Sequence, residues 1–265
     1  MTLPMTTTRP DALTPDASGT VRSVALVTGA RGGVGRAVTA QLRAAGHRVA
    51  VVGRDAAALA EIEADAHIAA DTTTPEGAAQ ALATCFTLLG SAPTLLAHCV
   101  GSTLIAPLHR TSAAQYREVM RINLDSAFYI LHSWIEALRE ARVPGAAVFA
   151  SSVVARIGVA NHEAIAAAKG GIEALARSAA ATYAPLGVRV NVVAPGMTDT
   201  PLTANMLKLD AMRDGAGKQY PLGGIQTAEQ VADAMFWLLS PGAARITGQV
   251  IAVDGGFTTV RPLVR

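Results

Sequence analysis

Short apolar runs alternate with longer segments of helical apolar spacing along most of the chain. The first run, Val24–Thr28, has five residues and ends in a cluster of glycines, which is typical of a buried parallel strand. In the segment 34–45 that follows, apolar residues recur at helical spacing, and Gly46 is placed to end the helix. The same alternation of a strand and a helix repeats down the chain.

Seven strands and six helices are predicted in this way. The strands are 24–28, 48–53, 67–70, 95–99, 146–151, 188–194 and 249–253, and the helices are 34–45, 56–64, 76–89, 113–142, 163–184 and 227–239. Strands that alternate with helices imply right-handed crossovers. The pattern therefore predicts an α/β fold of the Rossmann type, a doubly wound parallel sheet with helices on both faces. Ligands of such sheets bind at the carboxyl ends of the strands.

Length and composition favour one domain that covers residues 22–265. The chain has 265 residues, 51% of them apolar, and no Pro/Gly/Ser-rich linker divides it. A net charge of +2 without a basic run disfavours nucleic acid or an anionic membrane surface as a partner. No apolar run approaches the length of a membrane span.

The cysteines and the first residues bear on localisation. Cys85 and Cys99 are isolated thiols without metal-ligand spacing, which suits a reducing cytoplasm and predicts no metal site. Residues 1–21 are rich in Thr, Pro and Asp and lack the apolar segment of a secretory signal. We expect a disordered N-terminal tail there and a cytoplasmic protein.

The turn after the first strand predicts a dinucleotide site. It reads Thr28-Gly29-Ala30-Arg31-Gly32-Gly33-Val34-Gly35. Glycines at such positions let the backbone approach a pyrophosphate, and the N–H groups at the start of the next helix point at that phosphate. Gly29, Gly33, Val34 and Gly35 are therefore candidate cofactor-binding residues.

The end of the second strand indicates which dinucleotide is bound. A site that prefers NAD carries a carboxylate there for the ribose 2′-hydroxyl, but this strand ends in Gly53-Arg54. The guanidinium of Arg54 suits a 2′-phosphate, and Arg31 in the glycine turn supplies a second positive charge. Each arginine alone is equally explained as a solvated surface residue. Together they favour NADP(H).

With the spacing Thr-Gly-x-x-x-Gly-x-Gly, the chain resembles the short-chain dehydrogenase/reductases over about residues 22–257. Further matching positions are Asp71, Gly101, Asn123, Ser152, Lys169, the loop Pro195-Gly196-Met197-Thr198-Asp199-Thr200 and the segment 247–256. The resemblance implies that Asp71 binds the adenine ring and that Gly101 lies close to the cofactor. It implies that Pro195, Gly196, Thr198 and Thr200 hold the nicotinamide carboxamide, and that Lys169 holds the nicotinamide ribose.

The resemblance also implies a mechanism, and one part of it is missing. In the family a hydride passes between the nicotinamide and a carbonyl carbon, and a tyrosine one helical turn before the lysine moves the proton. Ser152, Lys169 and Asn123 match the serine, lysine and asparagine of that mechanism, but Ile165 stands at the tyrosine position. Loss of a positioned general acid costs about 10²–10⁴-fold in rate. The sequence also departs from the family at His98 and Cys99, which are expected to be packing residues.

His162 is the candidate replacement for the tyrosine. It precedes Ile165 by three residues, so both side chains project near the same helix face, and histidine exchanges protons near neutral pH. The alternative is that Asn161-His162-Glu163 is only a polar first turn, with Asn161 as the cap and Glu163 complementing the helix dipole. Tyr220, in the segment 200–222 that resembles the family's substrate lid, stays open as another proton donor.

These observations leave three hypotheses for function. The first is an NADP(H)-dependent oxidoreductase with an atypical proton donor, acting on a partly hydrophobic carbonyl, alcohol or enone. The second is an NADP(H)-binding protein without turnover, a sensor or the inactive partner of a catalytic homologue. The third is non-redox lyase or isomerase chemistry. The resemblance also implies a homotetramer or homodimer, with helices 113–142 and 163–184 at the interface and an apolar face at Leu124, Phe128, Leu131 and Ile135.

Overall fold

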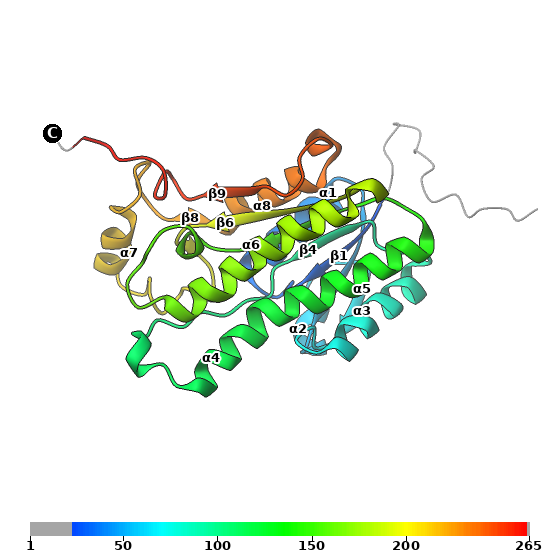
Figure 1. The fold of residues 1–265 in the computed structure, drawn as a ribbon, viewed down its shortest axis with the longest axis horizontal. Coiled ribbons are helices and arrows are strands. Elements are labelled where there is room, and N and C mark those ends of the chain that lie inside the picture. Colours follow the sequence, from blue (N-terminus) through cyan, green and yellow to red (C-terminus); the bar gives the residue numbers. More distant parts are fainter. Residues whose placement is uncertain (1–22, 264–265) are drawn as a thin grey trace, which may run out of the picture.

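Seven parallel strands form the central sheet of the computed structural model, which describes residues 23–263 (Figure 1). The order across the sheet is β3-β2-β1-β4-β5-β6-β9. The strands are β1 (Val24–Thr28), β2 (Arg48–Gly53), β3 (Ala66–Ala69), β4 (Leu95–His98), β5 (Gly145–Ala150), β6 (Val188–Pro195) and β9 (Val250–Val253). Because β1 pairs with both β2 and β4, the winding direction reverses between β1 and β4, where sheets of this type bind ligands.

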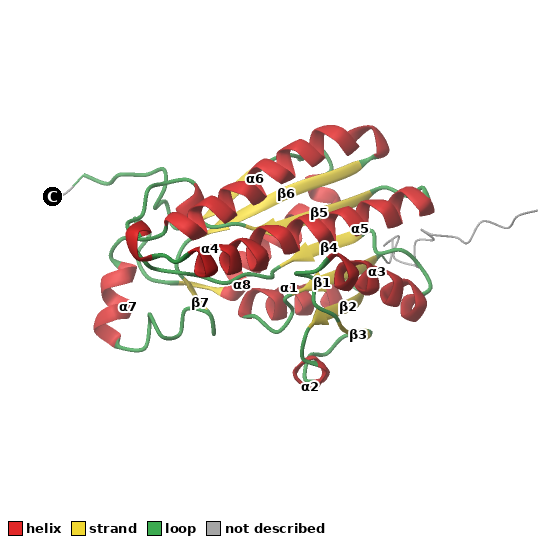
Figure 2. Cartoon of the chain, turned by 60° about the horizontal axis from the view of Figure 1, so that its bottom comes forward, coloured by secondary structure: helices red, strands yellow, loops and turns green. Residues whose placement is uncertain are grey.

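Helices cover both faces of the sheet (Figure 2). One face carries α1 (Gly33–Ala44), α2 (Ala56–Ala60) and α8 (Ala228–Leu239), and the other carries α3 (Pro75–Leu89), α5 (Ser126–Ala141) and α6 (Glu163–Tyr183). Each face has its own apolar core, because both sides of every central strand are buried. The predicted doubly wound fold is confirmed.

The predicted helix 113–142 is interrupted. The chain forms α4 (Ala113–Met120), a π-helical turn over Arg121–Asp125, and then α5. A π turn holds more residues per turn than an α-helix, and such turns occur often at functional sites. Another prediction was too long, since α2 ends at Ala60 rather than residue 64. The predicted tail, residues 1–21, lies outside the described residues.

The apolar face predicted for self-association is wrong in two of its four positions. Leu131 and Ile135 are each only 4% exposed and belong to the core between α5 and the sheet. Leu124 is partly buried against the same core, whereas Phe128 is 50% exposed. Helical spacing identified an apolar stripe on α5, but the stripe packs mostly inward against this chain's own sheet.

The segment 200–222 lies beyond the sheet and contains a helix that the sequence did not predict. This helix is α7 (Asp210–Gly217), which the ribbon shows away from the main body of the sheet (Figure 1). Two short parallel strands, β7 (Thr198–Asp199) and β8 (Gln226–Thr227), join the two ends of the segment. We call residues 200–222 the lid segment. Within residues 23–263, no helix is long and apolar enough to cross a membrane.

Candidate active site

Two cavities open at the carboxyl ends of the strands and share residues 99–102. The first, of about 370 Å³, lies between β5, α6 and the lid segment, and we call it the lid cavity. The second, of about 660 Å³, lies over the glycine-rich turn and the ends of β2 and β3, and we call it the turn cavity. Together they span the β1–β4 switch point, where a dinucleotide would extend from one cavity into the other.

The glycine turn leaves room for a ligand only because side chains are absent. Gly29 has a φ of +67°, and a Cβ there would lie 2.6 Å from the carbonyl carbon of Cys99. A Cβ on Gly33 would lie 2.8 Å from the Thr200 side chain, and one on Gly35 would collide with the backbone at Gly29. The α1 helix begins at Gly33, so its free N–H groups face the turn, while Val34 lines the lid cavity. The turn therefore fits a pyrophosphate.

Both candidate arginines line the turn cavity. Arg31 and Arg54 are exposed there, next to Asp55. Asp55 caps α2 by accepting the Ala58 N–H at 3.1 Å, and its other oxygen lies 3.6 Å from Arg31. The carboxylate of Asp55 thus caps α2 and pairs with Arg31. Arg54, by contrast, has no ion-pair partner among residues 23–263.

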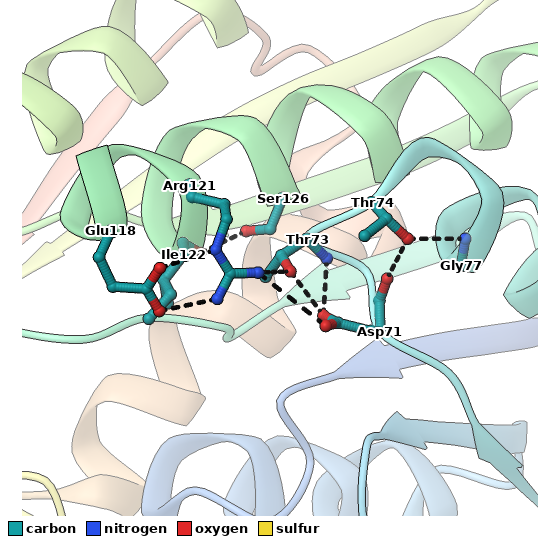
Figure 3. Close-up of polar contacts among 8 residues, drawn as sticks. All are labelled: Asp71, Thr73, Thr74, Gly77, Glu118, Arg121, Ile122 and Ser126. Atoms are coloured by element: carbon teal, nitrogen blue, oxygen red, sulfur yellow. Dashed lines mark hydrogen bonds and ion pairs between the residues drawn. The ribbon is translucent and has the colours of Figure 1, made fainter. Parts of the chain in front are cut away.

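Asp71 lines the turn cavity, and its carboxylate is held by neighbouring polar side chains (Figure 3). One of its oxygens accepts the Thr73 N–H at 3.0 Å and the Thr73 hydroxyl at 2.7 Å. Arg121, paired with Glu118 at 2.7 Å, also donates to the Thr73 hydroxyl. Partial burial alone would raise the pKa of Asp71, but the hydrogen bonds from Thr73 and the charges of Arg54 and Arg121 lower it below its usual value. The carboxylate is therefore ionised and available to accept a hydrogen bond.

Lys169 projects from α6 into the lid cavity. Its ammonium donates to the Ala150 carbonyl at 2.8 Å, at the end of β5, and the residue is only 6% exposed. Burial lowers the pKa of Lys169 to about 8, and the nearby Cys99 opposes this shift. Of the three ammonium protons, the described residues accept one, so two face the cavity.

The π turn places Asn123 next to Lys169. Asn123 is fully buried and donates to the Val119 carbonyl at 2.9 Å and to the Ser102 hydroxyl at 3.0 Å. Its oxygen accepts the Ser102 N–H at 3.2 Å. A Cβ on Gly101 would lie 3.2 Å from both the Asn123 oxygen and the Lys169 nitrogen. Gly101 thus keeps open a space between these two polar groups.

Ser152 follows β5 and lines the lid cavity close to Lys169 in the fold. Its oxygen accepts the Val154 N–H at 3.4 Å, which leaves its proton free to be donated. The preceding Ser151 is buried and donates to Glu173 at 3.0 Å. The sequence analysis did not identify Glu173 as part of the site. Its position four residues after Lys169, on the same face of α6, was the signal that could have indicated the contact with Ser151.

Ile165 is 3% exposed and packs in a small apolar cluster with Val119, Ala164 and Ala168. It also lines the lid cavity. At this position the cavity is therefore lined by a hydrocarbon side chain that neither donates nor accepts a proton.

His162 lines the same cavity one turn before Ile165. It is the N-cap residue of α6, and its Nδ1 lies 2.7 Å from the Ala160 carbonyl, an acceptor, so Nδ1 carries a proton and Nε2 is free. The alternative cap at Asn161 is wrong, because Asn161 has a φ of +65° and precedes the cap. Glu163 does lie in the first turn of α6.

The expectation of packing roles for His98 and Cys99 holds for the histidine. His98 is fully buried between the Thr28 hydroxyl at 2.7 Å and the Ser126 hydroxyl at 3.1 Å. Burial and the charge of Lys169 lower the pKa of His98 to about 3, so the ring stays neutral. Cys99 lines both cavities, and burial raises the pKa of its thiol to about 12, which keeps it neutral as well.

The loop after β6 forms the remaining wall of the lid cavity. Pro195, Gly196, Thr198 and Thr200 all line it. The Thr198 hydroxyl donates to the Gly196 carbonyl at 3.0 Å, and the Thr200 and Thr203 hydroxyls lie 3.2 Å apart. Across residues 23–263, no group of three metal-ligating side chains occurs.

Comparison with known proteins supports this geometry. Residues 29–258 match the family model described as "Enoyl-(Acyl carrier protein) reductase". A cis-4-hydroxycyclohexanecarboxylate dehydrogenase of Sinomonas cyclohexanicum is 37% identical over 89% of this chain and 97% of its own. An "Inactive 2-(S)-hydroxypropyl-CoM dehydrogenase 2" of Xanthobacter autotrophicus is 36% identical over 82% of this chain and 97% of its own.

A solved structure shows the same fold. The aldohexose dehydrogenase of Thermoplasma acidophilum, in ligand-free form, superposes with a TM-score of 0.84 at 27% identity, over 92% of this chain and 97% of that one. The matches run through the glycine turn, the strands and the C-terminal strand alike, so they cover the whole domain. The chain belongs to the short-chain dehydrogenase/reductase family, the NAD(P)(H)-dependent oxidoreductases that act on alcohols and carbonyl groups.

Proposed function

We propose that this protein is an NADP(H)-dependent oxidoreductase that interconverts a compact, largely apolar alcohol and its ketone, with His162 in place of the usual tyrosine. The observation that carries the proposal is the lining of the lid cavity. Ser152, Lys169 and His162 all line it, and so does Ile165, which offers no proton.

The residues of the turn cavity fit NADP(H). The glycine turn would hold the pyrophosphate, Arg54 and Arg31 the 2′-phosphate, and Asp71 the adenine. Lys169 would hold the nicotinamide ribose, with the loop 195–200 on the nicotinamide carboxamide. When bound, the cofactor supplies or accepts the hydride.

The chain's own groups would handle the substrate oxygen. The free Ser152 proton suits a hydrogen bond to a carbonyl oxygen, which aligns the substrate. Because Nδ1 of His162 already donates to Ala160, a second proton on this ring resides on Nε2. In ketone reduction the imidazolium would give that proton to the oxygen, and in alcohol oxidation the neutral ring would take it back.

The proposed substrate class follows from the rest of the lining. Val100, Val153, Val159, Leu202 and Met206 are among the apolar side chains around the polar groups. A cavity of about 370 Å³ suits a small ring rather than a long chain. The name of the Sinomonas relative specifies an alcohol on a cyclohexane ring, which supports a small alicyclic alcohol or ketone here.

The test measures NADPH consumption with a panel of cyclic ketones, beside NADPH affinity by fluorescence. His162→Ala should lower kcat by about 10²-fold or more, while the affinity for NADPH stays unchanged. His132→Ala, which removes an exposed imidazole on α5, is the matched control and should have no effect. Full turnover in His162→Ala would exclude the histidine and point to water as the proton source.

A second candidate function is NADP(H) binding without turnover. It is favoured by the tight apolar packing of Ile165 and by the relative whose name calls it inactive. The same assays separate the two functions. A wild type that binds NADPH tightly yet reduces none of the ketones would establish the binding protein.

A further inference from the structure

Tyr220 stands at the end of the lid segment and forms part of the lid cavity. Its ring packs against Phe257, with ring centroids 5.2 Å apart. It also covers Gly196 so closely that a Cβ there would lie 2.7 Å from the ring. Its hydroxyl oxygen accepts the Met197 N–H at 2.6 Å. The ring and the hydroxyl are therefore both fixed by neighbours.

Most other hydroxyl and amide groups around the lid cavity already have partners within the protein. Ser151 donates to Glu173, Thr198 donates to Gly196, and Thr203 donates to Thr198 and Thr200. The groups that still have a proton to offer lie in three places: Ser152, Lys169 and His162 in the segment 152–169, Ser102 and Thr103 in the loop after β4, and Tyr220 and Gln219 in the lid segment.

The Tyr220 hydroxyl keeps one proton that it can donate to a ligand. A phenol oxygen that accepts one N–H keeps a single proton to donate, and none of the hydrogen bonds among residues 23–263 uses it. Gln219 differs, because it is exposed to solvent and has no such fixed partner. Around Tyr220 the lining side chains Met197, Leu202, Met206 and Phe257 are apolar. An unsatisfied oxygen of a ligand in that region would meet few other donors.

We propose that the Tyr220 hydroxyl is a second substrate-binding group, which donates a hydrogen bond to an oxygen on the substrate remote from the reacting carbon. The inference rests on the proposed function, in which Ser152 and His162 contact the reacting oxygen. It narrows the substrate class to small rings with two oxygen functions, one at the reacting carbon and one acceptor on the lid side. Burial raises the pKa of Tyr220 and the Met197 N–H opposes that shift, so the phenol stays protonated at neutral pH.

The test compares two ketones of the same shape, cyclohexane-1,4-dione and 4-methylenecyclohexanone, which differ by an oxygen in place of a methylene group. Their dissociation constants are measured by calorimetry with the protein saturated in NADP⁺, so no reduction takes place. We expect the dione to bind the wild type about six- to twentyfold more tightly, because one neutral hydrogen bond provides about three- to tenfold and the two equivalent carbonyls of the dione contribute a further statistical factor of about two. In Tyr220→Phe this ratio should fall to about two, the statistical factor alone, while the affinities for the methylene ketone and for NADP⁺ stay unchanged.

Tyr183→Phe, which removes a hydroxyl at the far end of α6, is the matched control and should keep the wild-type ratio. A ratio of about two or less in the wild type would overturn the proposal without any variant, and a wild-type ratio that survives in Tyr220→Phe would overturn it too. Binding of neither ketone would overturn it together with the proposed substrate class. A Tyr220-dependent ratio in a protein that reduces neither ketone would support this inference and overturn only the proposed reaction.

Discussion

At the scale of single residues, the site is notable for one hydrocarbon among polar groups. Ile165 is buried beside Val119 and Ala168 and still reaches the cavity that Ser152 and Lys169 line. Under the proposed function, Ser152, Lys169 and Asn123 take the roles that the resemblance implies, and a tyrosine at position 165 would supply the proton donor of that mechanism.

In a His162→Ala background, where the proposed proton donor is absent, Ile165→Tyr should raise the rate of ketone reduction by about 10²–10⁴-fold, the usual contribution of a positioned general acid. The new hydroxyl would lie one helical turn from Lys169, whose positive charge would lower the pKa of the phenol. Steady-state NADPH oxidation measures the effect, and Ile165→Phe serves as the control of equal bulk. An equal gain in both variants would show that shape, rather than the hydroxyl, was limiting.

Arg54 is expected to decide the choice between the two dinucleotides. NADPH should bind more tightly than NADH, and Arg54→Ala should reduce the preference by about tenfold or more, because a charge-assisted contact to the 2′-phosphate is lost. Fluorescence titration with both cofactors gives the ratio. An exposed arginine outside the cavity, Arg110, provides the control substitution to alanine. Equal affinities in the wild type would contradict the expectation.

Lys169 should make folding stability depend on pH. Its pKa is about 8 in the folded protein against an ordinary value of 10.5, so between these values the unfolded chain binds more protons and stability rises with pH. Below about pH 8 the buried charge costs its full amount, on the order of 3 kcal/mol. Lys169→Met removes this pH dependence. The free energy of unfolding of the wild type minus that of the variant, measured by denaturant unfolding, should therefore increase between about pH 8 and pH 10. A constant difference would contradict the lowered pKa.

At the scale of elements, α6 and the end of β5 act as one unit. Glu173 on α6 holds Ser151 at 3.0 Å and Arg156 at 3.4 Å, and Lys169 holds Ala150. The strand end that carries Ser152 is thereby fastened to the helix that carries Lys169. The relative position of the two catalytic candidates depends on these contacts.

Glu173→Ala should lower the free energy of unfolding by about 1–3 kcal/mol. It removes the partner of Arg156 and leaves the buried Ser151 hydroxyl only the more distant Lys169 carbonyl, at 3.3 Å, as an acceptor. It should also raise KM, since Ser152 would be less well positioned. Glu140→Ala, at an exposed position near the end of α5, is the control and should change stability by less than about 0.5 kcal/mol. Denaturant unfolding of both variants measures the difference, and equal stabilities would show that the contact is dispensable.

The spacing of apolar residues predicted the alternating strands and helices, because that spacing depends on which face of each local element is buried. It missed the π turn at Arg121–Asp125, since one extra residue in a turn leaves apolar spacing almost unchanged. It misjudged Leu131 and Ile135, because an apolar stripe does not say whether its partner is this chain's sheet or another copy. The glycines of the turn after β1 were identified from their spacing, and Asn123, Ser152 and Lys169 from the family resemblance. The contact between Met197 and Tyr220, 23 residues apart with β7 and α7 in between, follows only from the fold of the lid segment.

At the scale of the whole molecule, exposed aromatic side chains on α4 and α5 bear on self-association. Phe128 and Tyr116, 50% and 44% exposed, lie on the side of α4 and α5 turned away from the sheet. We expect a homodimer or homotetramer in which these side chains are covered, because exposed aromatic residues on one face favour association. Phe128→Glu should shift the population toward the 27.2 kDa single chain. Light scattering that gives only this mass for the wild type at micromolar concentration would refute the expectation.

Residues 99–102 line both the lid cavity and the turn cavity. A dinucleotide that extends from one into the other would pass over Gly101 and become a wall of the lid cavity. An alcohol or ketone that binds before the dinucleotide would find the lid cavity open to water at the wall that the dinucleotide would form. We therefore expect a compulsory order, in which the dinucleotide enters first and leaves last, so that its rate of release sets an upper limit on turnover.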